Sequence, residues 1–321
     1  MRKLILLMGF LYLGLSTSMA QQDPVFSHFM FNPYYNSPAL TAFDGLSSIS
    51  LISRNQWTGY DPSFESEGGA PTTQFFNYTA PLHYKKAPMG IGGTFIYDQF
   101  GPRQDVYVQM SLSYHLDMPR GRFSLGLRPS VSRRVLDYSK LVTVDPTDLD
   151  QTQVQSQMMP DLAAGLAYSS HDYMIAFGID HLLTPSFDFG YGEAPTQSNR
   201  QEMVYSLYAT YSYLMSEYVE LKPAILARTN ISGFSYDISV RAVYMTKVWA
   251  GLSYRDSEAI TVLLGYSFFG DKSLSLGYSF DYIVNDREYK QSTSHELYVH
   301  YNLPTLNGRT KKIIRTPRFR F

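Results

Sequence analysis

Seven histidines are the side chains of this sequence best suited to metal binding or acid–base chemistry. They are scattered, without the close spacing of a metal site, at His28, His83, His115, His171, His181, His295 and His300. The chain has no cysteine, which argues against a structural zinc site. A hydrolase would need a serine converging on a histidine such as His115 or His300, and no serine is singled out as a nucleophile. We expect no catalytic, cofactor or metal residues and no enzyme activity.

Three aspartates are the other candidate for ion binding. Asp145, Asp148 and Asp150 lie close together in the longest expected loop, and carboxylates are the ligands that Ca²⁺ prefers. The glycine that the calcium-loop pattern requires is missing. A solvated acidic loop is therefore favoured over a calcium site.

Much of the chain consists of segments with one apolar and one polar face. Residues 274–282 place Leu, Leu, Tyr, Phe and Tyr at alternate positions, with Ser, Gly, Ser and Asp between them. Successive side chains of a strand point to opposite faces, so one face is apolar and aromatic. Residues 260–268 alternate in the same way, and Gly270-Asp271-Lys272-Ser273 joins the two segments, which predicts a β-hairpin.

The same pattern recurs along the chain and predicts about fourteen strands. They are expected near 46–57, 72–84, 89–99, 104–117, 122–135, 160–169, 172–183, 202–214, 217–229, 235–246, 247–255, 258–269, 273–284 and 295–303. Most have about 10 residues or more, as tilted membrane-spanning strands require. The 27 tyrosines and 20 phenylalanines fit the aromatic belts of such a protein.

The connections give a second test of this interpretation. Connections after odd-numbered strands are mostly long, as in 58–71, 136–159, 184–201 and 285–294, whereas those after even-numbered strands are short. Outer-membrane barrels have short periplasmic turns and long external loops. A soluble β-sandwich would have shorter strands and no such sorting. We expect an all-β, transmembrane, antiparallel up-and-down barrel over residues 44–303, located in the bacterial outer membrane.

The two ends of the chain differ from the barrel. In residues 1–20, two basic residues, an apolar run and Ser18-Met19-Ala20 predict a secretory signal peptide. Residues 304–321 form a basic tail, interpreted either as a solvated tail or as a periplasmic docking peptide. The net charge of −1 argues against a nucleic-acid partner.

The segment 21–43 is broken by prolines but rich in aromatic residues. A disordered tail is usually poor in aromatics, so we expect this segment to pack in or under the barrel as a plug. Charges of both signs are expected on the inward faces of the strands, where the segment would meet them. The expected lumen-facing charges are Arg128, Glu220, Lys222, Arg228, Arg241, Arg255, Asp281 and Glu296. The expected plug or partner-binding residues are Phe26, Phe29, Phe31, Tyr34, Tyr35 and Trp57.

Several segments resemble one known family in order along the chain. They are Gln22-Asp23-Pro24-Val25-Phe26-Ser27-His28-Phe29-Met30-Phe31-Asn32-Pro33, Arg54-Asn55-Gln56-Trp57-Thr58-Gly59-Tyr60, Gly69-Ala70-Pro71-Thr72-Thr73-Gln74, Trp249-Ala250-Gly251-Leu252-Ser253-Tyr254-Arg255, Leu276-Gly277-Tyr278-Ser279-Phe280-Asp281-Tyr282 and Ser294-His295-Glu296-Leu297. Together they resemble the PorP/SprF proteins of the type IX secretion system in Bacteroidota.

The resemblance implies an outer-membrane component that binds, anchors or helps to export surface proteins carrying a C-terminal sorting domain. The implied partners are other proteins of that secretion system and a secreted cargo, which in gliding bacteria is a large adhesin. A porin or hydrophobic-solute channel is the main alternative, and an outer-membrane lipid hydrolase is a remoter one.

Overall fold

The computed structural model describes residues 23–60, 69–84, 87–140, 154–187, 189, 200–285 and 290–304. The expected signal peptide, nearly all of the basic tail, and the three aspartates of the candidate calcium loop lie outside these residues. The described strands are β1 (Ser48–Asn55), β2 (Thr72–Tyr84), β3 (Ala87–Phe100), β4 (Arg103–Met118), β5 (Gly121–Asp137), β6 (Val154–Ser169), β7 (Tyr173–Asp180), β8 (Val204–Tyr211), β9 (Tyr213–Leu214), β10 (Val219–Thr229), β11 (Phe234–Tyr244), β12 (Val248–Arg255), β13 (Ala259–Phe268), β14 (Leu274–Ile283) and β15 (Thr293–Asn302).

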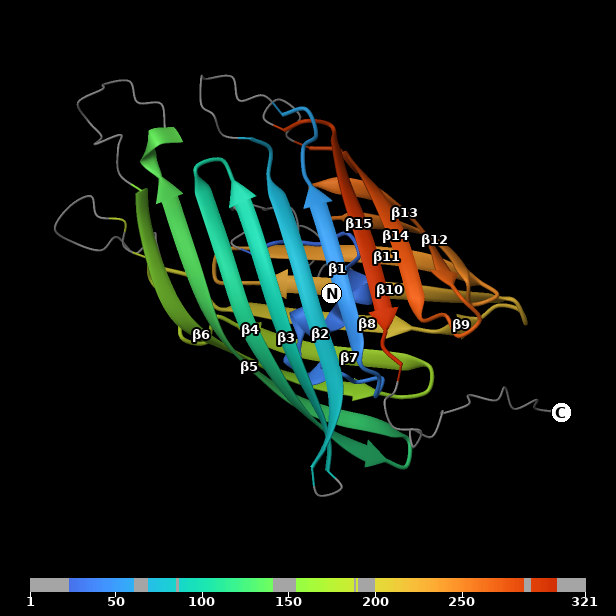
Figure 1. Cartoon of the computed structure of the whole chain (residues 1–321). Helices are drawn as coiled ribbons and strands as arrows, with labels where there is room; N and C mark the ends of the chain where they lie inside the picture. The colour runs from blue at the N-terminus through green and yellow to red at the C-terminus, as the bar shows by residue number, and fades with distance from the viewer. Residues whose placement is uncertain are drawn as a thin grey trace, which may run out of the picture.

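These strands form one closed antiparallel sheet (Figure 1). Sequence neighbours pair throughout, and β1 pairs with β15 along its whole length to close the ring. The segments β8 and β9 both pair with β10 and are one strand interrupted at Ser212. The fifteen segments therefore make a barrel of fourteen strands, which confirms the predicted architecture.

The largest differences from the predicted strand boundaries are at β6 and β7. The strand β6 begins at Val154 instead of residue 160, and it pairs with β5 over its whole length. The polar run Gln155-Ser156-Gln157 hides this extension, because backbone pairing with β5 does not require apolar side chains. The strand β7 ends at Asp180 instead of residue 183, since His181 adopts a φ of 58° that a strand cannot contain.

The outer surface of the barrel is apolar and its inner surface is polar. Along β4, Val108, Met110 and Leu112 point outward with 53%, 59% and 45% of their surface exposed. Ser111 and Ser113, which alternate with them, are buried inside. Only a lipid environment covers such a continuous outward apolar face without a second sheet.

The lengths of the connections differ between the two ends of the barrel. All the long ones lie at one end, called here the loop end: residues 56–71, 138–153, 181–203 and 284–292. The short helix η3 (Tyr138–Lys140) begins one of them. At the opposite, turn end the longest connection is only residues 269–273. This sorting by parity agrees with the prediction.

The N-terminal segment lies inside the barrel, as predicted, and residues 23–43 are called the plug from here on. Figure 1 shows it in blue, surrounded by the strands. It contains the short helices η1 (Phe29–Phe31), α2 (Pro33–Asn36) and η2 (Pro38–Leu40). Pro33 and Pro38 stand at the first turn of α2 and η2, where a missing N–H costs nothing. Among the described residues, no helix has the length and apolar character needed to cross a bilayer.

The contrast between the apolar outer face and the polar inner face of the barrel gives a first prediction. Leu264 of β13 points outward and is 54% exposed, so Leu264→Arg places a cation in lipid at a cost of about 2–4 kcal/mol. We expect a lower yield of folded protein and a lower urea midpoint after refolding into vesicles, read from heat-modifiable gel mobility. Ser275→Arg, on the inner face of β14, is the control and should be milder. Equal losses would mean that the two faces do not lie in different solvents.

A second prediction follows from the difference between the loop end and the turn end of the barrel. Because long connections of outer-membrane barrels face outside, an epitope tag inserted within residues 141–153 should bind antibody on intact cells. A tag between Pro119 and Arg120, in the β4–β5 turn, should become accessible only after lysis. The opposite pattern of labelling would reverse the assigned orientation.

Candidate functional site

The aromatic side chains of the plug pack against the barrel wall in two clusters. Phe26 contacts Phe75 and Tyr35, with ring centroids 5.1 Å and 5.3 Å apart. The other cluster holds Phe29, which is 3% exposed, and its neighbour Phe31. Tyr34 packs against both clusters. Five of the predicted site residues therefore lie together in the lumen.

The ring of Phe31 packs against three side chains of the wall. Its centroid lies 4.6 Å from that of Trp249 and 4.9 Å from that of Tyr298. The guanidinium of Arg241 covers its face at 4.1 Å, a cation–π contact. Gly265 leaves the space that the Trp249 ring fills, since a Cβ there would come within 2.0 Å of it.

Trp57, the sixth predicted residue, lies apart from the plug. It follows β1 at the loop end, where its ring contacts Tyr60 and Phe100 at 5.8 Å and 6.0 Å. The backbone N–H of Trp57 donates to Ser294 Oγ at 3.0 Å, which ties this loop to the start of β15. Trp57 thus belongs to an external aromatic cluster, and a role in partner binding stays a prediction.

The strongest link between plug and wall is a group of buried charges. Arg54, Asp281 and Glu296 have fully buried side chains, and Arg54 Nη1 lies 2.8 Å from Asp281 Oδ2 and 3.1 Å from Glu296 Oε2. The plug residues Ser27 and His28 complete this group, which is called here the carboxylate anchor. Ions so far from water are tolerated only when paired and hydrogen-bonded.

The carboxylate anchor holds the plug through main-chain and side-chain bonds. The N–H groups of Ser27 and His28 donate to the two oxygens of Glu296 at 2.8 Å and 2.9 Å. Ser27 Oγ donates to Asp281 at 2.8 Å, and His28 Nδ1 lies 2.7 Å from Glu296 Oε1. The sheet register places Arg54 directly opposite Glu296, so the pairing of β1 with β15 sets this geometry.

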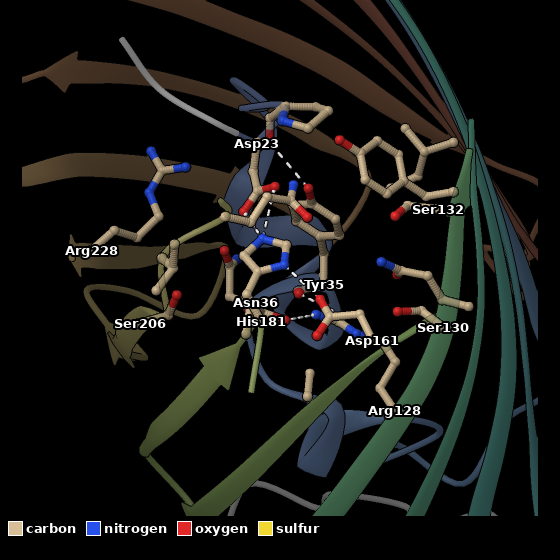
Figure 2. A pocket seen from close by; sticks show the side chains of 18 residues that line it. Asp23, Tyr35, Asn36, Arg128, Ser130, Ser132, Asp161, His181, Ser206 and Arg228 are labelled. Atoms are coloured by element: carbon tan, nitrogen blue, oxygen red, sulfur yellow. Dashed lines mark hydrogen bonds and ion pairs between the residues drawn. The ribbon is translucent and has the colours of Figure 1, made fainter. Parts of the chain in front are cut away.

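A second ionic group holds the beginning of the plug (Figure 2). His181 lies between two carboxylates, with Nε2 2.9 Å from Asp23 of the plug and Nδ1 2.6 Å from Asp161 of β6. Arg128 pairs with Asp180 and donates to Tyr35 O at 2.7 Å. Burial by itself would raise the pKa of Asp23, but the neighbouring His181 and two arginines hold it below its ordinary value.

A third group lies between these two. Asp237 of β11 accepts from Arg255 Nε at 2.7 Å and from Arg228 Nη2 at 2.9 Å. Arg255 also donates to the main-chain oxygen of Phe26 at 3.2 Å. The wall arginines therefore bind acidic wall residues and plug carbonyls at the same time.

At the turn end the plug is held by neutral groups and one cation. Ser113 Oγ donates to Thr41 O at 2.8 Å, and His115 Nε2 lies 3.2 Å from the same oxygen. Arg122 donates to Phe43 O at 2.8 Å. His115 contacts Ser124 and Ser113 as well, so its ring is engaged in holding the plug.

The plug and the wall approach each other closely at wall glycines. A Cβ on Gly178 of β7 would lie 1.9 Å from Asn36 O. A Cβ on Gly126 of β5 would lie 2.2 Å from Ala39 N. Only glycine permits backbone contact this close, so these two positions are matched to the path of the plug.

The lumen-facing charges predicted from the sequence take part in this interface or in pairs beside it. Arg128, Arg255, Asp281 and Glu296 bind the plug directly, while Lys222 pairs with Glu220 at 3.1 Å. Sequence reasoning missed Arg54, Asp161, His181 and Asp237. Strand parity would have found Arg54, which follows the inward Ser48, Ser50 and Ile52 at alternate positions.

The chemistry of the site is that of a polar interface. Within the described parts of the chain, no group of three or more His, Asp or Glu side chains has the geometry to hold a metal ion. The carboxylates and histidines of the lumen bind one another, arginines and plug amides. The arrangement can hold a peptide segment in a fixed position.

Three solved structures resemble this fold at low sequence identity. A Pseudomonas aeruginosa FadL homologue is 12% identical, with 84% of this chain and 93% of that chain covered and a TM-score of 0.45. The Acinetobacter baumannii outer membrane protein Omp33 is 9% identical over 81% of this chain and 100% of its own, with a TM-score of 0.44. The Pseudomonas putida toluene transporter TodX is 10% identical over 84% and 92%, with a TM-score of 0.46. No curated protein matches the chain.

One family matches nearly the whole sequence. The family described as type IX secretion system membrane protein PorP/SprF matches residues 18–301, which include the plug and every strand through most of β15. The family description and the closed antiparallel barrel together place the protein in the bacterial outer membrane and associate it with that secretion system. The chain belongs to the PorP/SprF family of type IX secretion system membrane proteins.

Proposed function

We propose that this protein is a sealed outer-membrane barrel that binds and anchors surface proteins delivered by the type IX secretion system. The proposed cargo carries a C-terminal sorting domain, as the large adhesins of gliding bacteria do. The barrel acts by binding instead of catalysis, and other proteins of the secretion system are its working partners. Family membership supports the secretion role, and the interior of the barrel supports the binding role.

The observation that carries the proposal is the plug fixed by buried ion pairs. Ser27, His28 and their partners Arg54, Asp281 and Glu296 all have 2% or less of their surface exposed. Removing one member of a buried ion pair typically costs about 3–5 kcal/mol, so a plug held this way leaves rarely. A lumen filled in this manner favours an anchoring protein over an open porin or a hydrophobic-solute channel.

The plug gives a third prediction, on conductance. In planar bilayers the intact protein should be nearly silent. Gly178→Ala introduces a methyl group where Asn36 O lies, so it should displace the plug and produce channel events. Deleting residues 26–35 should raise conductance further while the barrel stays folded. Gly93→Ala, where a Cβ meets nothing within 4 Å, is the matched control and should stay silent. Porin-like conductance of the intact protein would refute the sealed barrel and favour the channel.

A fourth prediction tests cargo binding in cells. Deleting the gene should abolish surface display of a cargo with a C-terminal sorting domain, measured by antibody labelling of intact cells. The wild-type gene should restore display. Photo-crosslinking from Trp57, in the external aromatic cluster, should trap that cargo, whereas crosslinking from Leu276 on the lipid face should not. Normal display without the gene would contradict the proposed function.

A further inference from the structure

A small polar cavity lies between the first residues of the plug and the barrel wall (Figure 2). Its volume is about 40 Å³, measured as the space open to the centres of water molecules, and it is not closed on all sides. A single water needs roughly 10–15 Å³ by this measure, so the cavity holds a few waters or one small polar group. Tyr35 of the plug and Tyr107 of β4 are among its walls.

The charged groups of this cavity already bind one another. Both ring nitrogens of His181 are occupied by Asp23 and Asp161, and Arg128 pairs with Asp180. The third basic residue of the cavity, Arg228, pairs with Asp237, so every carboxylate and guanidinium here has an oppositely charged neighbour. A ligand of the cavity is therefore expected to be neutral.

The free hydrogen-bonding capacity of the cavity lies in its amides. Gln201 is 3% exposed, and neither its Nε2 nor its Oε1 has a hydrogen-bond partner among the described residues. Gln109 Oε1 and Arg228 Nε, from residues that also line the cavity, are buried and unpartnered in the same part of the chain. Leaving a buried donor or acceptor without a partner destabilises the protein, so an occupant that satisfies these atoms is favoured.

Gln201 is held in place by its own backbone. Its N–H donates to Pro185 O at 2.9 Å, and the preceding Arg200 forms a β-bridge with Ser186. The buried side-chain amide presents a donor and an acceptor side by side. A carboxamide is the neutral group that offers the complementary acceptor and donor in the same arrangement, whereas a single hydroxyl oxygen meets only one of the two atoms well.

We propose that this cavity is a recognition site for a carboxamide group of a polypeptide, with Gln201 as its central binding residue. The carboxamide comes from an Asn or Gln side chain, or from the main chain of an extended segment. This inference rests on the proposed function, since a secretion-system barrel handles polypeptides. It adds to that function a defined binding position inside the barrel, next to the ion pair between Asp23 of the plug and His181.

The test uses the full-length protein in lipid nanodiscs and three capped peptides, acetyl-Gly-Gly-Xaa-Gly-Gly-N-methylamide, with Asn, Asp or Ala as Xaa. Binding is measured by NMR titration. If the carboxamide comes from a side chain, the Asn peptide should bind saturably and about tenfold or more tightly than the Asp and Ala peptides, which lack the neutral side-chain amide. If it comes from the main chain, all three peptides should bind saturably and about equally well.

The variants are Gln201→Met, which keeps the length and removes both polar atoms, and Gln74→Met as control. Gln74 is exposed on the outside of the barrel, where its side-chain amide donates to Ser53 Oγ at 2.9 Å. Gln201→Met should weaken binding about tenfold and Gln74→Met should not. Both must remain silent in planar bilayers, which shows that the plug is in place.

Two results overturn the inference: no saturable binding of any peptide, which leaves ordered water as the occupant, or equal behaviour of the two variants. Surface display of cargo separates this failure from that of the proposed function. If Gln201→Met binds the peptides as tightly as the wild-type protein does and the gene is still required for display, the inference fails and the proposed function stands. If display does not require the gene, the proposed function fails whatever the titration shows.

Discussion

The absence of hydrogen-bonding partners in lipid is the constraint on which this structure depends. Every strand must present apolar side chains outward, so its polar side chains are directed into the lumen. A ring of fourteen strands is too wide for the inward side chains of opposite walls to satisfy one another. Arg54, Asp281 and Glu296 would then face an unfilled space. The plug supplies the missing hydrogen bonds and excludes water from these ions.

The dependence is mutual, because the plug contains little regular structure. Its three short helices leave many backbone groups without partners inside the segment. Wall side chains provide them: Glu296 accepts from two N–H groups, and arginines donate to Phe26 O, Tyr35 O and Phe43 O. Side chains of the barrel wall thus accept and donate the hydrogen bonds that helix or sheet partners would otherwise provide to the plug backbone. Plug and wall satisfy one another's polar groups.

The position of the binding groups has a consequence for function. The ion pairs that hold the plug are concentrated toward the loop end, around Ser27 and Asp23, while neutral contacts dominate near Thr41. The outward side of the barrel therefore carries the rigid, charged part of the seal, directly beneath the long connections. A protein that fixes cargo at the cell surface needs a firm base in that place, whereas a solute channel needs a clear path.

The sequence alone determined the fold class, the number of strands, the side of each strand that faces lipid, and the parity of long and short connections. These features follow from the alternation of apolar and polar residues within each strand and from the turn residues between strands. The alternation arises because one face of every strand meets lipid and the other faces the lumen. It also indicated that the aromatic segment 21–43 fills the barrel. Only the tertiary structure decided that Arg54 meets Glu296, that His181 joins Asp23 to Asp161, that Trp57 stands apart, and that Gln201 is unpartnered. These contacts join residues up to 242 positions apart, and register, barrel closure and the path of the plug fix them together, so no local pattern records them.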